Sequence, residues 1–261
     1  MRISSVHNKK ILALRKLYKS RERKASGVFI AEGVKEVTRG ISSDFEIQAL
    51  YYSPGIFKGG IEDIVENTHY EFPVFEVDEP VYKKIAYRDN TEGLLAVFKK
   101  KIFTIGDFEV GENSLFIVLE SVEKPGNLGA VLRTADAAGV DAVILTESKV
   151  NQYHPNVIRS SIGAAFTVPV IITDNNSLLQ WFKANGIKSY AAVLPAYKSL
   201  YELDARGKIA FVFGTESEGL SDFWFDNADE KYTIPMSGIV DSLNVSVSVA
   251  ISIFEAKRQR G

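Results

Sequence analysis

The chain of 261 residues contains no cysteine, which excludes both disulfide bonds and metal sites built on cysteine. Its three histidines, His7, His69 and His154, are far apart and lack metal-ligand spacing, so we expect no metal centre. No apolar run approaches the roughly 18 residues of a membrane-spanning helix. With 46% apolar and 25% charged residues, the composition is typical of a globular protein, and we expect a cytoplasmic location without a membrane partner.

Charge is distributed unevenly along the chain. The net charge is only −2, but residues 1–25 hold nine Lys and Arg against one Glu, a local charge of +8 that leaves −10 on the rest. A basic block on an acidic body is suited to attracting phosphate groups at one place. Two other interpretations stay open: the charged face of a solvated helix, and a mitochondrial transit peptide. The transit peptide is disfavoured because the segment continues into the first predicted strand without a clear cleavage signal.

The first hundred residues alternate between short apolar runs and helical patterns, which predicts a small α/β domain over residues 1–100. A basic helix is expected within residues 1–25, and a second helix from residue 32 to 39 is predicted to end at Gly40. Glycines and scattered charge make residues 101–113 a predicted linker. The predicted strands of this domain are residues 28–31, 47–52, 74–77 and 93–98.

Residues 114–261 repeat the alternation with nearly continuous apolar runs, which are typical of strands buried on both faces of a parallel sheet. A helix is predicted over residues 128–138, closed by Gly139. The stretch after Leu243 is ambiguous, because its period of two favours a strand whereas its length and terminal cations favour a helix. The predicted strands are residues 114–119, 142–145, 168–172, 189–193 and 209–213.

Three segments of this half place polar side chains at the ends of predicted strands, where α/β sheets bind ligands. The first, residues 127–135, contains Asn127 and Arg133, and arginine offers a fixed cation with a planar group suited to phosphate. The second, residues 213–221, combines glycines, which let a backbone approach a ligand, with glutamates that do not suit a phosphate cradle. The third, residues 234–246, carries Ser242 and Asn244 at the entry of the last helical pattern.

In this order and spacing, the three segments resemble the three motifs of the SpoU (TrmH) family of RNA ribose methyltransferases. The resemblance covers residues 115–261, and a weaker one covers the N-terminal part through residues 29–33 and 91–96. Matching positions give the candidate catalytic residues Arg133, Asn127, Ser242 and Asn244. The candidate cofactor-binding residues are Gly214, Glu216, Gly219, Ile234, Met236 and Leu243.

The resemblance implies an α/β fold in which a small N-terminal substrate-binding domain precedes a SPOUT domain with a deep trefoil knot. It implies S-adenosylmethionine as cofactor, held mainly by backbone, and methyl transfer to a ribose 2'-hydroxyl of RNA without a metal. It also implies a homodimer and a helical ending. We expect this last helix at the dimer interface, with Val249 and Ile253 contacting the partner.

Two positions depart from the family pattern and leave the substrate open. Lys124 stands where Asp is common, and Glu92 stands where Gln is usual. Ribosomal RNA is favoured over transfer RNA because a separate N-terminal domain suits the ribosomal members of the family.

Simpler structural interpretations remain for single residues. They are a surface salt bridge for Arg133, and helix capping by Ser221 or Ser242. A catalytically silent RNA-binding protein of the same fold is the main alternative. A dinucleotide-dependent oxidoreductase is disfavoured because no G-x-G-x-x-G follows the first buried strand of either half.

Overall fold

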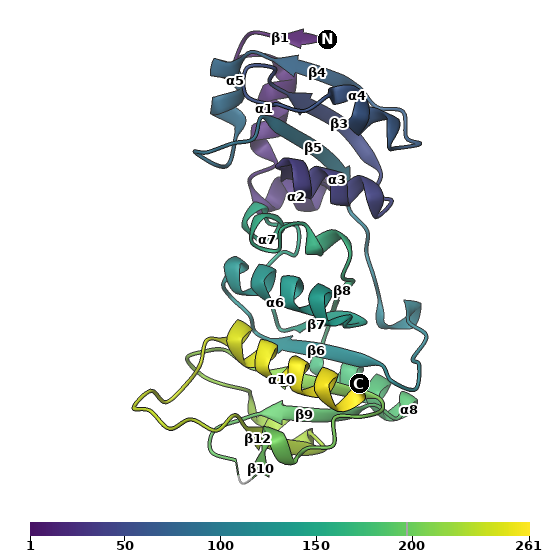
Figure 1. Cartoon of the computed structure of the whole chain (residues 1–261), viewed down its shortest axis with the longest axis vertical. Coiled ribbons are helices and arrows are strands. Elements are labelled where there is room, and N and C mark those ends of the chain that lie inside the picture. Colours follow the sequence, from purple (N-terminus) through teal and green to yellow (C-terminus); the bar gives the residue numbers. More distant parts are fainter. Residues whose placement is uncertain (197) are drawn as a thin grey trace. The chain divides into compact units, whose positions relative to one another are not determined.

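The computed structural model describes residues 1–196 and 198–261 and divides them into two compact units (Figure 1). The first unit comprises Met1–Lys101 together with Asn151–Thr167. The second comprises Ile102–Val150 and Val168–Gly261. No helix in the described part of the chain is long and apolar enough to cross a membrane.

A five-stranded sheet forms the centre of the first unit, in the order β1-β4-β3-β5-β2. Strand β5 runs antiparallel to both of its neighbours, whereas β4 pairs in parallel with β1 and β3. The strands that the apolar runs predicted are confirmed, with bounds shifted by one residue at most. The strands are β1 (Arg2–Ile3), β2 (Val28–Glu32), β3 (Ile47–Tyr52), β4 (Val74–Val77) and β5 (Leu94–Lys99). The helices are α1 (Lys9–Lys16), α2 (Ser20–Ser26), α3 (Val34–Ser42), α4 (Ile61–Glu66) and α5 (Glu79–Ile85).

Gly40 does not end its helix, so that prediction is wrong. Helix α3 continues to Ser42, and Gly40 lies inside it. A Cβ atom at this position would lie 2.6 Å from the Phe98 ring and 2.9 Å from the Phe166 ring. The glycine is therefore present because two aromatic rings pack against the helix backbone, which a sequence pattern does not reveal.

Part of the first unit's core comes from a distant stretch of chain, residues 151–167. This stretch holds α7 (Pro155–Ser160) and a short 3₁₀ turn, and it belongs to residues that the sequence analysis assigned to the C-terminal half. Tyr153 stacks on Phe29 with ring centroids 4.2 Å apart, and Phe166 meets Phe45 edge-on at 4.9 Å. The aromatic core of the first unit thus depends on two segments of the chain.

The second unit is built on a seven-stranded, all-parallel sheet in the order β10-β12-β9-β11-β6-β7-β8. Every residue of its strands β6, β7 and β11 is buried, which confirms strands covered on both faces. The strands are β6 (Leu115–Glu120), β7 (Ala142–Thr146), β8 (Val170–Thr173), β9 (Lys188–Ala192), β10 (Lys198–Ser199), β11 (Ile209–Phe213) and β12 (Glu230–Thr233). The helices are α6 (Pro125–Ala138), α8 (Asn175–Asn185), α9 (Asp222–Asn227) and α10 (Val245–Arg260).

The ambiguous C-terminal stretch is a helix, α10, as the family resemblance implied. It packs on α6 and β11, and Ser252 on its buried side exchanges a hydrogen bond of 2.8 Å with the Tyr232 hydroxyl. Val249 and Ile253 are fully buried in the unit's own core, so the prediction that they face a partner is wrong. The large apolar side chains that α10 leaves exposed are Val247 and Phe254.

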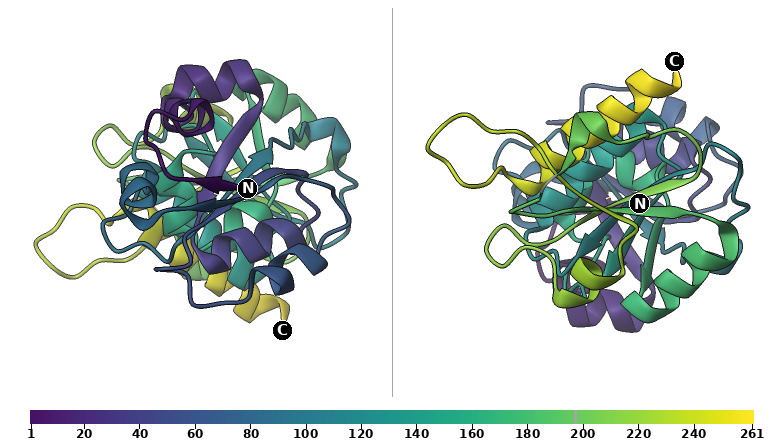
Figure 2. Two further views of the ribbon diagram at one scale, coloured as in Figure 1. Left: turned by 90° about the horizontal axis from the view of Figure 1, so that it is seen from above. Right: turned by 90° about the horizontal axis from the view of Figure 1, so that it is seen from below.

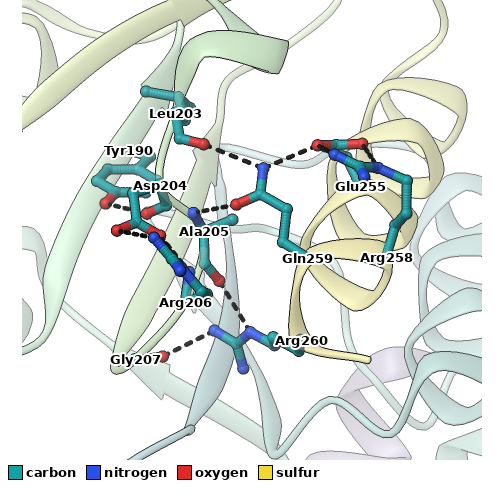
Figure 3. A network of polar contacts seen from close by, with 10 residues as sticks. All are labelled: Tyr190, Leu203, Asp204, Ala205, Arg206, Gly207, Glu255, Arg258, Gln259 and Arg260. Carbon is teal, nitrogen blue, oxygen red and sulfur yellow. Dashed lines mark hydrogen bonds and ion pairs between the residues drawn. The ribbon is translucent and has the colours of Figure 1, made fainter.

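Polar side chains fix the last turn of α10 to the loop that precedes β11 (Figure 3). The Gln259 amide accepts the Ala205 N–H at 2.8 Å and donates to the Leu203 carbonyl at 3.0 Å. Arg260 donates to the carbonyls of Ala205 and Gly207 at 2.9 and 2.8 Å. The third polar segment leads into the opposite, N-terminal end of α10.

Candidate active site

All three polar segments lie at one edge of the seven-stranded sheet. The first follows β6, the second follows β11, and the third follows β12. These strands run parallel, and β11 is paired with β6 on one side and with β9, the neighbour of β12, on the other. Their carboxyl ends therefore meet at the same edge. The loop from β12 to α10 stands out from the rest of the unit (Figure 2).

The second segment forms a closed loop between Gly214 and Ser221. Thr215 and Gly219 exchange two backbone hydrogen bonds of 3.0 and 3.1 Å. A Cβ atom on Gly214 would lie 1.9 Å from the Gly219 carbonyl oxygen, and Gly219 has a positive φ of 71°. Both glycines are thus required by the closure of the loop itself, whereas the sequence analysis related them to a ligand.

A buried carboxylate at the end of β6 holds the far side of this loop. Glu120, which is 4% exposed, accepts hydrogen bonds from the Ser221 N–H at 2.8 Å and the Ser221 hydroxyl at 2.7 Å. It also accepts the Asn175 amide at 2.7 Å, and Asn175 in turn accepts the Trp224 indole N–H at 2.8 Å. Ser221 is the N-cap residue of α9, as one interpretation of the sequence predicted, but its hydroxyl bonds to Glu120 and makes no capping hydrogen bond.

Sequence reasoning missed Glu120 and Asn175. One signal was available, since Glu120 is the only charged residue in an apolar run that ends at a ligand-binding edge.

One carboxylate, that of Glu216, connects the three segments. Its Oε1 accepts the Asn127 amide of the first segment at 3.0 Å and the Asn244 amide of the third. Its Oε2 accepts the ammonium of Lys124 at 2.6 Å. The hydrogen bond from Lys124, with a further contribution from Asn127, lowers the pKa of Glu216. The contact with Glu216 in turn raises the pKa of Lys124. Glu216 therefore stays ionised as a hydrogen-bond acceptor and is a poor proton acceptor.

Asn244 has most of its hydrogen-bonding capacity occupied within the protein. As the N-cap of α10, its Oδ1 accepts the Ser246 N–H at 3.0 Å and the Ser246 hydroxyl at 2.6 Å. Its amide nitrogen donates to Glu216 and, at 3.3 Å, to Asn127. Asn244 rather than Ser242 caps the helix, so the capping interpretation of Ser242 is wrong. Ser242 is exposed and donates to Asp241 at 3.3 Å.

A cavity of about 350 Å³ lies beside this polar cluster, within the size range of small-molecule sites. Its walls come from the ends of β9, β11 and β12, from the second segment and from the start of α10. Glu216 lines it and so belongs to both the cavity and the cluster, and Glu218 adds a second carboxylate. The wall includes Ser242 and all six candidate cofactor residues, Gly214, Glu216, Gly219, Ile234, Met236 and Leu243.

Arg133 lies apart from the cluster. It is exposed on the third turn of α6, and its side chain makes no hydrogen bond or ion pair with the residues that the structure describes. Arg133 comes six positions after Asn127 in α6, which places the two about 9 Å apart along the helix axis and about 120° apart around it. The surface salt bridge that was the simpler interpretation of Arg133 is absent from the described part of the chain.

The basic N-terminal segment is a mostly exposed cationic face with one buried exception. Arg23 is 1% exposed and donates to the carbonyls of Leu17 and Tyr18, both at 2.8 Å. It connects α1 to α2 instead of contributing to the surface charge. The other eight cations of residues 1–25 are exposed. Across the described residues, no group of three or more His, Asp or Glu side chains lies in a metal-binding arrangement.

Comparison with known proteins assigns both halves. The sequence model of the SpoU rRNA Methylase family matches residues 114–254, and that of the MRM3-like substrate binding domain matches residues 8–96. A 23S rRNA (guanosine-2'-O-)-methyltransferase RlmB of Xylella fastidiosa (strain 9a5c) is 43% identical over 151 residues. That match covers 58% of this chain and 61% of the relative.

Solved structures match nearly the whole chain. One is a crystal structure of an RNA 2'-O ribose methyltransferase, with a TM-score of 0.88 and 35% identity over 100% of this chain and 99% of that chain. Another is an AdoMet-bound rRNA methyltransferase from Sinorhizobium meliloti, with a TM-score of 0.91 and 28% identity over 99% and 97% of the two chains. The fold and the site define a mixed α/β protein with a ligand cavity at the carboxyl ends of a parallel sheet. The chain belongs to the SpoU rRNA Methylase family.

Proposed function

We propose that this protein transfers a methyl group from S-adenosylmethionine to a ribose 2'-hydroxyl of structured RNA, with ribosomal RNA favoured over transfer RNA. The observation that carries the proposal is the convergence of all three polar segments on Glu216, at the rim of a cavity of about 350 Å³. The names of the Xylella and Sinorhizobium proteins support ribosomal RNA as the substrate.

The cavity suits a cofactor that carries positive charge beside an apolar group. Glu216 and Glu218 supply negative charge, whereas Leu194, Phe225 and Ile234 supply apolar surface. Two carboxylates disfavour a nucleotide phosphate at this place and complement an ammonium or sulfonium group.

We assign cofactor contacts to the backbone of Gly214, Ile234 and Leu243, with Glu216, Gly219 and Met236 completing the wall. When bound, S-adenosylmethionine supplies an activated methyl group. Its reaction with a hydroxyl needs no metal in this proposal.

The chain's own task is to orient the ribose and to stabilise the charge that develops on its hydroxyl oxygen. We assign the charge stabilisation to Arg133, because a guanidinium with a pKa above about 12 is a poor base. The Asn127 amide donates one N–H to Glu216 and accepts one hydrogen bond from Asn244. Among the described residues, this leaves one side-chain N–H and one oxygen lone pair that can hold the ribose or its phosphate. Ser242 offers a hydroxyl on the cavity wall, and Asn244 orders Asn127 and the start of α10.

RNA is proposed to contact the exposed cations of α1 and α2 through its phosphates. Residues 8–96 match a substrate binding domain, which supports RNA contacts in the first unit. We propose an N-terminal substrate-binding domain over 1–100, a connection over 101–113 and a methyltransferase domain over 114–261. The structure adds that residues 151–167 pack with the first of these.

The remaining features of the proposal concern assembly and location. We propose a deep trefoil knot in the second unit and a homodimer, both supported by membership of the family. Val247 and Phe254 on α10 are 45% and 48% exposed and are apolar positions available for a partner. A cytoplasmic location is proposed because ribosomal RNA is modified where ribosomes assemble.

Mass spectrometry of ribosomal and transfer RNA nucleosides from a strain lacking the protein tests this function. The proposal expects one 2'-O-methylated nucleoside to disappear from ribosomal RNA and to return when the gene is restored. Loss of a methylated nucleoside from transfer RNA alone would favour the transfer RNA alternative. Unchanged nucleosides, together with RNA binding by the purified protein, would favour the silent RNA-binding alternative.

A further inference from the structure

Lys124 contacts the carboxylate on which the three segments converge. It directly precedes Pro125, the first residue of α6, at the N-cap position, but its side chain caps nothing. Its ammonium instead reaches Glu216 Oε2 at 2.6 Å. The Lys124 side chain is 70% exposed, whereas that of Glu216 is 27% exposed. The pair thus lies at the rim of the cavity, between solvent and the polar cluster.

The two oxygens of Glu216 serve different partners. Oε1 accepts the amides of Asn127 and Asn244, and Oε2 accepts Lys124. A carboxylate held at one oxygen can rotate about its side-chain bonds, whereas a carboxylate held at both has a defined plane. Lys124 therefore restricts the direction from which Oε1 accepts the two amides.

Charge provides a second reason for the contact. Glu216 is an anion at the rim of a site that RNA phosphates must approach, and like charges at close range repel. The ammonium of Lys124 offsets part of this charge without removing the capacity of the carboxylate to accept hydrogen bonds.

We propose that Lys124 is a positioning residue for methyl transfer, which fixes Glu216 and offsets part of its charge so that Asn127 and Asn244 are held in their working orientation. This inference rests on the proposed function. The competing role for an exposed lysine at this place is a direct contact with an RNA phosphate, independent of Glu216.

A double-mutant cycle separates the two roles. Single-turnover methylation of RNA is measured for the wild type, Lys124→Met, Glu216→Gln and the double variant. We expect Lys124→Met to lower the rate by about tenfold, on the scale of coupling between contacting residues. We also expect the double variant to be no slower than Glu216→Gln. If the two losses multiply in the double variant, Lys124 acts independently of Glu216 and the proposal is wrong.

Two further variants control for charge and for the loss of a surface lysine. Lys124→Arg keeps a donor for Glu216 and should restore most of the rate. Lys183→Met removes an exposed lysine of α8 whose side chain has no hydrogen bond or ion pair within the described chain, and it should behave as the wild type. A loss with Lys183→Met equal to that with Lys124→Met would contradict a specific role for Lys124.

A structural readout does not depend on methyl transfer. Carbon-detected NMR follows the carboxyl titration of Glu216, identified as the signal that Glu216→Gln removes. Lys124→Met should raise the pKa of Glu216, because the contact that lowers it most is gone. An unchanged pKa would overturn the inference even in an active enzyme. If Lys124→Met raises the pKa of Glu216 but the wild-type protein methylates no RNA, the contact stands and the proposed function is refuted instead.

Discussion

Replacing Gly214 by alanine should disturb the cofactor cavity by a mechanism that the structure defines. A Cβ atom at this position would lie 1.9 Å from the Gly219 carbonyl oxygen, 2.1 Å from its carbonyl carbon and 2.3 Å from the Leu220 nitrogen. All three are backbone atoms, which cannot rotate away as a flexible side chain can. The loop from Thr215 to Gly219 must therefore move by about 1 Å or more, because packed atoms do not approach so closely.

The size of the effect follows from the bonds that this movement breaks. The two backbone hydrogen bonds between Thr215 and Gly219, of 3.0 and 3.1 Å, close the loop. Each contributes about 0.5–1.5 kcal/mol, so their loss costs about 1–3 kcal/mol. Expressed as affinity, this corresponds to a roughly 5- to 160-fold higher Kd for a ligand that needs the closed loop.

Calorimetric titration with S-adenosylmethionine and urea unfolding of the same samples measure this loss. Gly214→Ala is expected to lower the affinity for S-adenosylmethionine, the free energy of unfolding, or both. Gly238→Ala is the matched control in the third segment, since its Cβ would meet no atom within 4 Å, and it should bind as the wild type does. A Gly214→Ala protein with unchanged affinity and an unchanged urea midpoint would refute the reasoning.

Four further predictions concern catalysis, RNA, assembly and pH. Arg133→Ala should lower the single-turnover rate at least about a hundredfold while cofactor affinity stays intact, and Arg133→Lys should be nearly as poor; a near-wild-type alanine variant would contradict this. Replacing the eight exposed N-terminal cations by glutamine, with Arg23 kept, should weaken RNA binding and flatten its dependence on salt. An unchanged salt dependence would show that these cations form only a solvated face. Phe254→Arg should yield monomers in sedimentation at micromolar concentration without unfolding, because Phe254 is 48% exposed; a stable dimer would place the interface elsewhere. Arg258 lowers the pKa of Glu255 to about 2 from an unfolded value of 4.5, so its contribution to stability is complete above pH 4.5 and lost as the pH falls towards 2. Urea midpoints of Glu255→Gln should therefore fall less with acid than those of the wild type and of the control Glu66→Gln, which removes an exposed carboxylate at the end of α4. Parallel curves would exclude the contribution of Glu255.

Strands were predictable where local pattern and tertiary environment agree. The runs that became β6, β7 and β11 are apolar throughout because both faces of the parallel sheet are covered, so burial leaves a local signature. The helix α10 shows the opposite case. Small residues alternate with branched ones along it, partly because Ser252 must reach Tyr232, and the resulting period of two resembles a strand.

Features that depend on distant contacts left no such signature. Position 40 of α3 is a glycine because the Phe98 and Phe166 rings leave no room for a Cβ atom, and Phe166 lies in a segment more than a hundred residues away. Arg23 has the sequence context of a surface cation but satisfies two backbone carbonyls in the interior. Within the site, the motif residues, Glu216 included, could be selected from sequence. The role of Glu216 as a shared hydrogen-bond partner could not, because it meets Lys124, Asn127 and Asn244 only in the folded chain.

The most direct test of the account is methyl transfer by the purified wild-type protein. Isotope-labelled S-adenosylmethionine and ribosomal RNA from a strain lacking the protein are incubated under single-turnover conditions in the presence of a chelator. The RNA is then digested, and the labelled nucleoside is identified by mass spectrometry. The account predicts a label on the ribose 2'-oxygen of one nucleoside. A label on a base, or no label from a protein that binds the cofactor and the RNA, would contradict it.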